Sequence, residues 1–336
     1  MADDHPILDR PALTTERYPW HDALWSALEH RFDRLPHALL LHGRPGLGKH
    51  VFAFQLAQAL LCAQPQAGAA CGKCHGCQLF AAGTHPDLSA LALPEDAKSI
   101  TIDQIRALGG FLSLRPHTAT RKVVIISPAE AMNLNAANSL LKLLEEPPLG
   151  SMLLLVTSHP VRLPATIRSR CSGVLFKSPA RGVGLAWLQS RPEGKTQPEI
   201  LLDLAAGAPL LAEVLAREGF LENRVKLLQD LKAMHSGRDE PVACATRWKN
   251  LGIKRCLGWL YGLVSELIKV QMGRLDAVSA NSEALFLLEK NKYEIRELYG
   301  YIDVIHENYR RLGGPLDELL MLEDVLIGWA RLRRLQ

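Results

Sequence analysis

The sequence predicts an α/β domain built on a parallel sheet, followed by a small helical domain and an all-α domain. Two observations support this prediction. Between about residues 35 and 179 short apolar runs alternate with segments of helical periodicity, and beyond Pro179 only the helical periodicity continues. Strands that alternate with helices are typical of a parallel sheet covered on both faces. We expect the three domains to span residues 1–178, 179–215 and 216–336.

Within the first domain, short apolar runs without a polar face predict the strands, since central strands of a parallel sheet are buried on both sides. They cover Ala38–His42, Leu88–Leu93, Lys122–Ile126, Met152–Thr157 and Val174–Phe176. Helical periodicity is found between them, at Lys49–Cys62, Thr101–Leu114 and Ala131–Glu146. The last of these helices should stop at Pro147 and Pro148, because proline cannot continue a helix.

Two short helices, Val183–Ser190 and Pro198–Ala206, are predicted for the second domain. In the third domain, apolar residues recur at the spacing of one helix face, at Leu260, Leu263, Val264, Leu267 and Ile268. Such helices can form a free bundle, or they can associate with copies of themselves or with relatives. The periodicity does not choose between these possibilities.

Composition excludes several classes of protein. The chain is 48% apolar and 22% charged, and its net charge of +4 is far below the strongly basic balance typical of a dedicated DNA-binding protein. Residues 1–17 lack the apolar segment of a secretory signal, and the longest apolar runs fall short of the roughly 20 residues that span a membrane. We therefore expect a cytoplasmic protein. Four of the seven cysteines crowd between Cys62 and Cys77, unlike a dispersed disulfide framework.

A glycine-rich turn follows the first predicted strand, with the sequence Gly43-Arg44-Pro45-Gly46-Leu47-Gly48-Lys49-His50. Its spacing is that of a phosphate-binding loop (P-loop), in which glycines let backbone amides approach phosphate and a lysine neutralises the charge. The strand before it and the helix after it supply the context that the motif requires. Gly43, Gly46, Gly48 and Lys49 are therefore candidate nucleotide-binding residues.

The residues that would hydrolyse a bound nucleotide are missing. His50 stands where Ser or Thr normally coordinates magnesium, and imidazole is a poor ligand for that oxygen-preferring cation. The strand Lys122–Ile126 ends in Ser127-Pro128-Ala129 instead of two acidic residues, and Glu130 is too far along to replace them. The chain could still be a divergent ATPase, but two independent losses favour an inactive site.

Three further segments resemble the clamp-loader branch of the AAA+ superfamily: Lys142–Pro148, Leu153–Thr157 and Ser169-Arg170-Cys171. The cysteine-rich insertion, Tyr18-Pro19-Trp20 and the degenerate ATP motifs narrow the resemblance to the delta-prime family of bacterial DNA polymerase III. It covers most of residues 18–215. The C-terminal helices match in length and class only.

This resemblance implies a RecA-like AAA+ domain, a helical lid and a helical collar that joins five subunits, including ATPase subunits and delta, in a ring. It also implies that the chain is a stator, which reaches the sliding clamp and primed DNA through the complex. Arg170 would be an arginine finger for the ATP site of an adjacent ATPase subunit. Thr157 would be at the position that senses the γ-phosphate, whereas Leu210 replaces a second sensor arginine. ATP binding in the chain's own site would be weak or absent.

The spacing Cys62-x8-Cys71-x2-Cys74-x2-Cys77 offers four thiols in a short segment. Four soft sulfur ligands suit a tetrahedral zinc ion, and a full thiolate set leaves no open position for catalysis. We therefore expect a structural zinc site that does not need His75 or His85, and clamp-loader subunits carry a similar module. A redox pair and reduced free cysteines are the alternatives.

The function expected from these observations is that of a non-hydrolysing clamp-loader subunit within the DNA polymerase III holoenzyme. One alternative is an active AAA+ ATPase, either in a clamp loader or in a related helicase, but position 50 and the segment after Ile126 lack the residues it needs. A second alternative is a stand-alone zinc-dependent DNA-binding protein. Residues 62–90 contain one lysine and no arginine, which is a poor composition for phosphate contacts.

Overall fold

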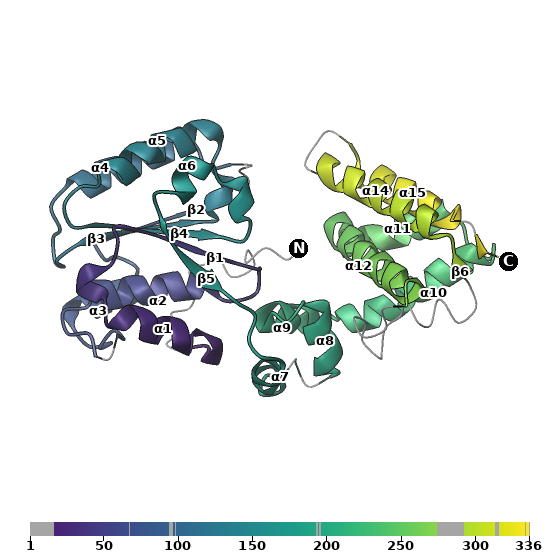
Figure 1. The fold of residues 1–336 in the computed structure, drawn as a ribbon, viewed down its shortest axis with the longest axis horizontal. Helices are drawn as coiled ribbons and strands as arrows, with labels where there is room; N and C mark the ends of the chain where they lie inside the picture. The colour runs from purple at the N-terminus through teal and green to yellow at the C-terminus, as the bar shows by residue number, and fades with distance from the viewer. Residues whose placement is uncertain are drawn as a thin grey trace. The chain divides into compact units, whose positions relative to one another are not determined.

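The computed structural model describes residues 17–335 except 67, 94–96, 98, 193, 195, 274–291, 313–315 and 333. It divides into two compact units (Figure 1). The first unit runs to Ser190 and includes Ala205–Ala212, and the second comprises Arg191–Leu204 together with the chain from Glu213 onward. The three expected domain boundaries stay a prediction, and the first 16 residues of the expected N-terminal domain lie outside the described part.

A five-stranded parallel sheet with the order β2-β3-β4-β1-β5 forms the centre of the first unit. Its strands are β1 Ala38–Gly43, β2 Leu88–Ala92, β3 Lys122–Ser127, β4 Ser151–Thr157 and β5 Ser172–Phe176. Helices α1, α2 and α3 cover one face, and α4, α5 and α6 the other (Figure 1). These helices span Asp22–Glu29, Lys49–Leu61, His75–Ala81, Ile102–Ser113, Leu134–Glu145 and Ala165–Arg168. The expected α/β domain, a parallel sheet covered by helices on both faces, is confirmed.

The three central strands are buried on both faces, as the apolar runs predict. The same prediction is wrong for the two edge strands, β2 and β5, which are partly exposed. Leu175 in β5, for example, is 48% exposed. An edge strand has a neighbour on one side only, so apolar composition does not guarantee burial there.

A buried carboxylate fixes the segment between α4 and β3. Asp87 is 0% exposed and accepts hydrogen bonds from the backbone N–H groups of His117, Thr118 and Ala119 at 2.7–2.9 Å. Burial alone would raise the pKa of Asp87, but these bonds lower it by more, to well below its ordinary value. The amino group of Lys122, also buried, lies 3.5 Å from the carboxylate and over the ring of Phe111.

The described part of the second unit is built mainly of helices. In chain order, the helices after the sheet are α7 Arg181–Gln189, which belongs to the first unit, then α8 Pro198–Leu204, α9 Pro209–Arg217, α10 Phe220–His235, α11 Pro241–Trp248, α12 Ile253–Gln271, α14 Ile295–Arg311 and α15 Glu318–Ala330. The predicted apolar face of α12 lies in the core of the unit, together with Trp248 and Trp329. The short antiparallel strands β6 (Lys292–Tyr293) and β7 (Arg334–Leu335) are too short to leave a sequence pattern. None of the described helices has the length and apolar composition needed to cross a membrane.

Replacing Asp87 by Asn tests the buried anchor. The substitution keeps the side-chain volume but leaves the Lys122 ammonium buried without its carboxylate, which costs about 3 kcal/mol or more. We expect the free energy of unfolding, measured by urea denaturation, to fall by that amount. The matched control is Asp103→Asn, whose carboxylate is 83% exposed and pairs with Arg106 on the surface of α4; its effect should stay below about 0.5 kcal/mol. Equally small losses in both variants would contradict the anchor role.

Candidate functional site

The P-loop connects β1 to α2, as the sequence predicts. Gly46 and Gly48 have φ angles of 73° and 78°, in the left-handed region that favours glycine. Both also touch other parts of the chain. A Cβ on Gly46 would lie 2.5 Å from Cβ of Leu211, and a Cβ on Gly48 would lie 2.6 Å from the ring of Tyr18. The glycines are therefore required by the packing of this chain, whether or not a phosphate binds.

The P-loop lysine is engaged by the loop itself. Lys49 is 0% exposed, and its amino group donates a hydrogen bond to the carbonyl oxygen of Arg44 at 2.7 Å. His50 is also buried, with its ring 4.8 Å from the ring of Phe54. One N–H donor of the Lys49 ammonium is thus used by the loop itself, and position 50 is part of the hydrophobic packing of α2.

Aromatic residues from the N-terminal segment cover the loop. Trp20 Nε1 donates to the carbonyl of Leu47 at 3.0 Å, and His21 Nε2 lies 2.8 Å from the same oxygen. Tyr18 stacks on Trp20 at a centroid distance of 4.9 Å, and Trp187 of α7 meets Trp20 edge-on at 5.3 Å. Burial lowers the pKa of His21 to about 4. His21 is therefore neutral at pH 7, and its Nε2–H donates to Leu47.

The beginning of α9 closes the loop from another side. The backbone N–H of Leu210 donates to the carbonyl of Gly46 at 3.2 Å, and the Leu210 side chain is buried. Leu210 stands where the resemblance places a sensor arginine in active subunits. A buried apolar side chain therefore stands at the position where active subunits would have the charged sensor arginine.

The other expected nucleotide residue, Thr157, ends β4 beside His42 at the end of β1. Its side chain is buried, and Oγ1 accepts a hydrogen bond from the N–H of His159 at 3.0 Å. Glu130 accepts hydrogen bonds from the N–H groups of Ser158 and His159 at 3.0 and 3.2 Å. The structure thus brings Thr157 and the P-loop to the same end of the sheet, and Glu130 fixes the segment after β4.

Arg170 lies at the opposite end of the sheet. It follows α6 and comes two residues before β5, whose Ser172 is paired with Leu39 of the parallel strand β1. Arg170 is thus level with His37, the residue before β1. The P-loop begins at Gly43, the last residue of β1. Six residues of strand at about 3.3 Å each give a separation of about 20 Å. Arg170 cannot reach the P-loop of its own chain.

The guanidinium of Arg170 is held in place by its own domain. Its NH2 group lies 2.7 Å from Glu145 Oε1, and its NH1 group donates to the carbonyl of Thr166 at 3.1 Å. The side chains of Arg170 and Glu145 are 37% and 49% exposed. Sequence reasoning found Arg170 but missed Glu145, because residues 25 positions apart share no spacing pattern.

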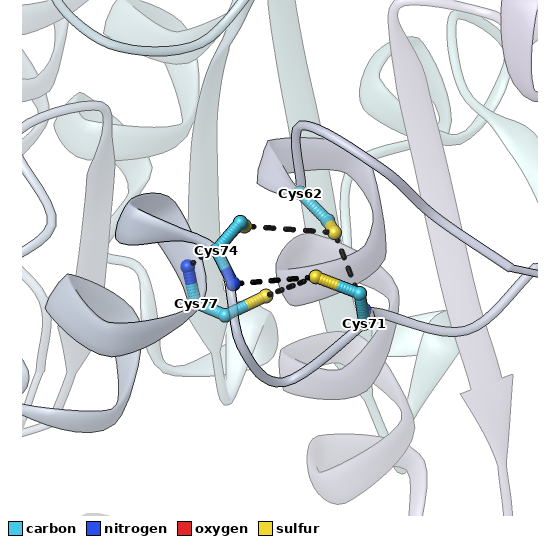
Figure 2. Close-up of side chains that lie close together, drawn as sticks. All are labelled: Cys62, Cys71, Cys74 and Cys77. Carbon is cyan, nitrogen blue, oxygen red and sulfur yellow. Dashed lines mark hydrogen bonds between the residues drawn. The ribbon is translucent and has the colours of Figure 1, made fainter.

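The four clustered cysteines converge at the end of α2 and the beginning of α3 (Figure 2). Their Sγ atoms all lie within 4.8 Å of one another. Cys62 Sγ is 3.8 Å from Cys74 Sγ, and Cys71 Sγ is 4.0 Å from Cys77 Sγ. A tetrahedral ion with metal–sulfur bonds of about 2.3 Å places its sulfurs about 3.8 Å apart. The cluster therefore has the shape of a four-thiolate metal site.

Backbone N–H groups surround the same sulfurs. Cys62 Sγ accepts from Gln64 and Cys71 at 3.4 and 3.3 Å, and Cys71 Sγ accepts from Cys74 at 3.4 Å. The N–H groups of Lys73 and Cys74 lower the pKa of the Cys71 thiol to about 6. These donors favour thiolate, the form that binds metal, at Cys71, whereas burial raises the pKa of the Cys62 and Cys77 thiols.

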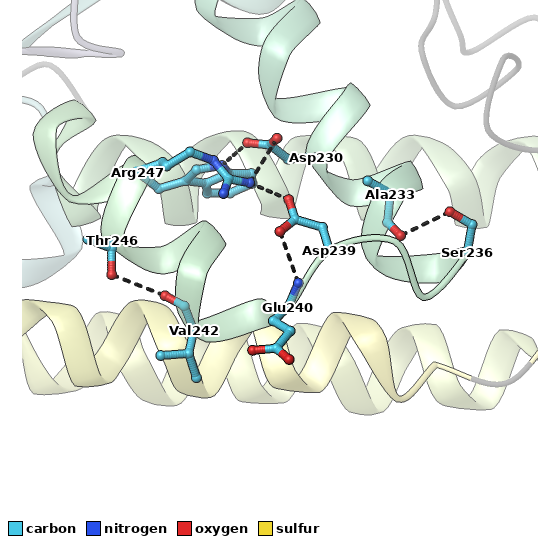
Figure 3. Close-up of polar contacts among 9 residues, drawn as sticks. Asp230, Ala233, Ser236, Asp239, Glu240, Val242, Thr246 and Arg247 are labelled. Atoms are coloured by element: carbon cyan, nitrogen blue, oxygen red, sulfur yellow. Dashed lines mark hydrogen bonds and ion pairs between the residues drawn. The ribbon is translucent and has the colours of Figure 1, made fainter.

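A second group of possible ligands, Asp230, Asp239 and Cys244, lies in the second unit. Figure 3 shows its two carboxylates beside Arg247. Here the guanidinium of Arg247 already pairs with both carboxylates, and Trp248 Nε1 donates to Asp230 at 2.9 Å. Burial raises the pKa of Cys244 to about 12. The negative charge is thus compensated by arginine and the thiol stays protonated, so this group is a structural network joining α10 to α11. Cys244 and Cys256 are both buried in the hydrophobic core of this unit.

Comparison with known proteins identifies the family. The sequence pattern described as "DNA polymerase III, delta subunit" matches residues 21–180, and the pattern for the C-terminal part of that subunit matches residues 218–331. The DNA polymerase III subunit delta' of Pseudomonas aeruginosa is 36% identical over 94% of this chain and 98% of its own length. The chain belongs to the delta-prime family. The Escherichia coli member is 32% identical over 92% of this chain and 94% of its own length.

A more distant relative matches this delta-prime chain over a shorter segment. The DNA polymerase III subunit tau/gamma of Haemophilus influenzae is 36% identical over 140 residues, which are 41% of this chain and 20% of that protein. The matched segment is thus a part of each of the two chains.

The buried imidazole of His21 predicts a pH-dependent stability. Its folded-state pKa of about 4 is below the ordinary 6.5. Below about pH 6.5 the unfolded chain therefore binds a proton that the folded chain does not, and stability falls until the pH reaches about 4. Between these limits we expect the free energy of unfolding of the wild type to fall by about 1.4 kcal/mol per pH unit more than that of His21→Gln. Urea denaturation at several pH values measures the difference.

The control for this measurement is His30→Gln, because His30 is an exposed histidine at the end of α1. It should follow the pH dependence of the wild type. A His21→Gln variant with the same slope as the wild type would show that the folded chain accepts a proton at His21 despite the burial of its ring.

Proposed function

We propose that this delta-prime family chain is a non-hydrolysing stator subunit of the DNA polymerase III clamp loader, which helps load the sliding clamp onto primed DNA. In this role Arg170 is the arginine finger for the ATP site of a neighbouring ATPase subunit. The observation that carries the proposal is the separation of Arg170 from its own P-loop by the length of the sheet, about 20 Å. An arginine so far from its own site can stabilise a transferring phosphoryl group only in trans.

The contacts of the chain's own P-loop also support a non-hydrolysing role. A nucleotide would need the Lys49 amino group, which the carbonyl of Arg44 holds, and a metal ligand at position 50, which is a buried histidine. ATP binding by Gly43, Gly46, Gly48, Lys49 and Thr157 is accordingly weak or absent in this proposal. An active ATPase or helicase would need the missing carboxylates after β3, so this alternative is disfavoured.

The partners follow from the family. Relatives named as delta' and tau/gamma subunits of DNA polymerase III support membership in its clamp-loader complex. In our proposal residues 216–336 form the collar that joins the ATPase subunits and delta in a ring of five, and residues 179–215 form the lid. The sliding clamp and primed DNA are reached through that complex, in the cytoplasmic replisome. A stand-alone DNA-binding role has no support from the cysteine segment, where Lys73 is the single lysine and arginine is absent between residues 62 and 90.

For the cysteine cluster we propose zinc. The sulfur separations match a tetrahedral ion, and four soft ligands leave no open coordination position. The ion would be structural: it would tie Cys62, at the end of α2, to the segment of Cys71 and Cys74 and to Cys77 in α3. A redox role would use two thiols, whereas this cluster brings four sulfurs together.

The finger assignment is tested in a reconstituted clamp loader in which only the neighbouring ATPase site can hydrolyse ATP. We expect Arg170→Ala to reduce turnover at that site at least tenfold, since arginine fingers contribute about 10³-fold or more in other NTPases. Arg168→Ala, which removes an exposed arginine two residues earlier, is the matched control and should leave turnover nearly unchanged. Unaltered turnover with Arg170→Ala would refute the finger, and ATP hydrolysis by the purified chain alone would refute the stator role.

The zinc assignment is tested by elemental analysis of protein purified without added metal. We expect about one zinc ion per chain in the wild type and a loss of most of it in Cys74→Ser, because three thiolates bind zinc less tightly than four. The matched control is Cys171→Ser, a partly buried cysteine outside the cluster, which should keep its zinc. Zinc-free wild-type protein with an unchanged thermal unfolding temperature after chelator treatment would contradict the proposal.

A further inference from the structure

We propose that Glu145 is a positioning residue for Arg170, which holds the guanidinium in the orientation that meets the neighbour's nucleotide; this inference rests on the proposed finger role of Arg170. The supporting geometry is that the Arg170 guanidinium contacts two acceptors. The Glu145 carboxylate accepts from NH2 at 2.7 Å, and the carbonyl of Thr166 accepts from NH1 at 3.1 Å. Because the guanidinium is planar and rigid, two acceptors on different helices define its orientation.

Both acceptors are fixed to the same hydrophobic core. Glu145 ends α5, and the preceding Leu144 is buried while its carbonyl accepts a hydrogen bond from His37 Nε2 at 3.0 Å. Thr166 lies in α6 beside Ile167, which is buried in the same cluster of side chains as Leu144. The backbone N–H of Arg170 donates to the carbonyl oxygen of Ile167 at 3.1 Å. The finger and its two acceptors therefore form one rigid group.

The position of Glu145 in its helix points to a role outside the helix. It is the last residue of α5, where the helix dipole presents its negative end, and a carboxylate there is unfavourable. An ion pair as exposed as this one also contributes little to folding. The contact is better suited to restricting the rotamers of Arg170 before it docks. A long side chain without such a contact would lose its rotamer freedom on docking, at a cost in binding free energy.

The hold leaves donors free for a ligand. A guanidinium has five N–H groups, and the two contacts use one hydrogen of NH1 and one of NH2. The remaining hydrogens suit phosphate oxygens, which guanidinium binds through parallel hydrogen bonds. Glu145 can therefore orient Arg170 without occupying the donors that the proposed reaction uses.

The test uses the reconstituted loader in which only the neighbouring site hydrolyses ATP. We expect Glu145→Ala to lower kcat about two- to fivefold, the range of an exposed ion pair, with the KM for ATP unchanged. Glu145→Gln should lose less, because its amide oxygen can still accept from Arg170. Combining Glu145→Ala with Arg170→Ala should give the kcat of Arg170→Ala alone. The matched control, Glu146→Ala, removes the adjacent exposed carboxylate and should behave as the wild type.

The outcomes separate the two proposals. If Arg170→Ala has no effect, the finger role fails and the positioning role fails with it. If Arg170→Ala is defective but Glu145→Ala matches Glu146→Ala, only the positioning role fails. A rise in kcat with Glu145→Ala would mean that the carboxylate withholds the guanidinium, and it would likewise overturn the proposal. If the alanine variant does not enter the loader on gel filtration, Glu145→Leu, whose side chain is of similar size but cannot accept a hydrogen bond, replaces it in the same comparison.

Discussion

The hydrogen bonds that this chain makes to the carbonyl groups of its own P-loop are the constraint around which the first unit is organised. Buried backbone carbonyls need donors. Here the carbonyl of Arg44 accepts a hydrogen bond from the Lys49 amino group, and the carbonyl of Gly46 accepts one from the N–H of Leu210. The carbonyl of Leu47 accepts from the side chains of Trp20 and His21. The donors come from the N-terminal segment, α2 and α9. A loop whose usual ligand is phosphate therefore joins two distant segments of the chain, the N-terminal segment and the beginning of α9, to β1.

The parallel sheet then determines what each end of the unit can do. All loops that follow strands meet at one end, and all loops that precede strands meet at the other. The P-loop and Thr157 are at the first end, and Arg170 is at the second. The proposed loss of nucleotide chemistry at the first end therefore places no constraint on Arg170, whose backbone is supported by α6 and whose guanidinium is supported by α5.

Sequence reasoning succeeded where the signal is local. Apolar runs gave all five strands of the sheet to within two residues, the P-loop context was correct, and the cysteine spacing anticipated sulfurs that converge. It failed for the exposure of β2 and β5, since strand order is a property of the whole sheet. It also missed the contacts of His21 with Leu47 and of Glu145 with Arg170. Both join residues about 25 positions apart through tertiary packing, which no periodicity encodes.

The same contacts explain why a P-loop packed against its own chain suits the proposed stator role. An ATPase must open and close its lid around nucleotide, so its lid contacts have to be weak enough to break in each cycle. In this chain the beginning of α9 is bonded to Gly46, and the rings of Tyr18 and Trp20 pack where the loop would otherwise face solvent. Burying these aromatic groups stabilises the unit. A site that does not have to open can contribute to rigidity, and rigidity is what an arginine offered to a neighbouring subunit requires, because displacing it by about 1 Å from the reacting phosphoryl would reduce its effect.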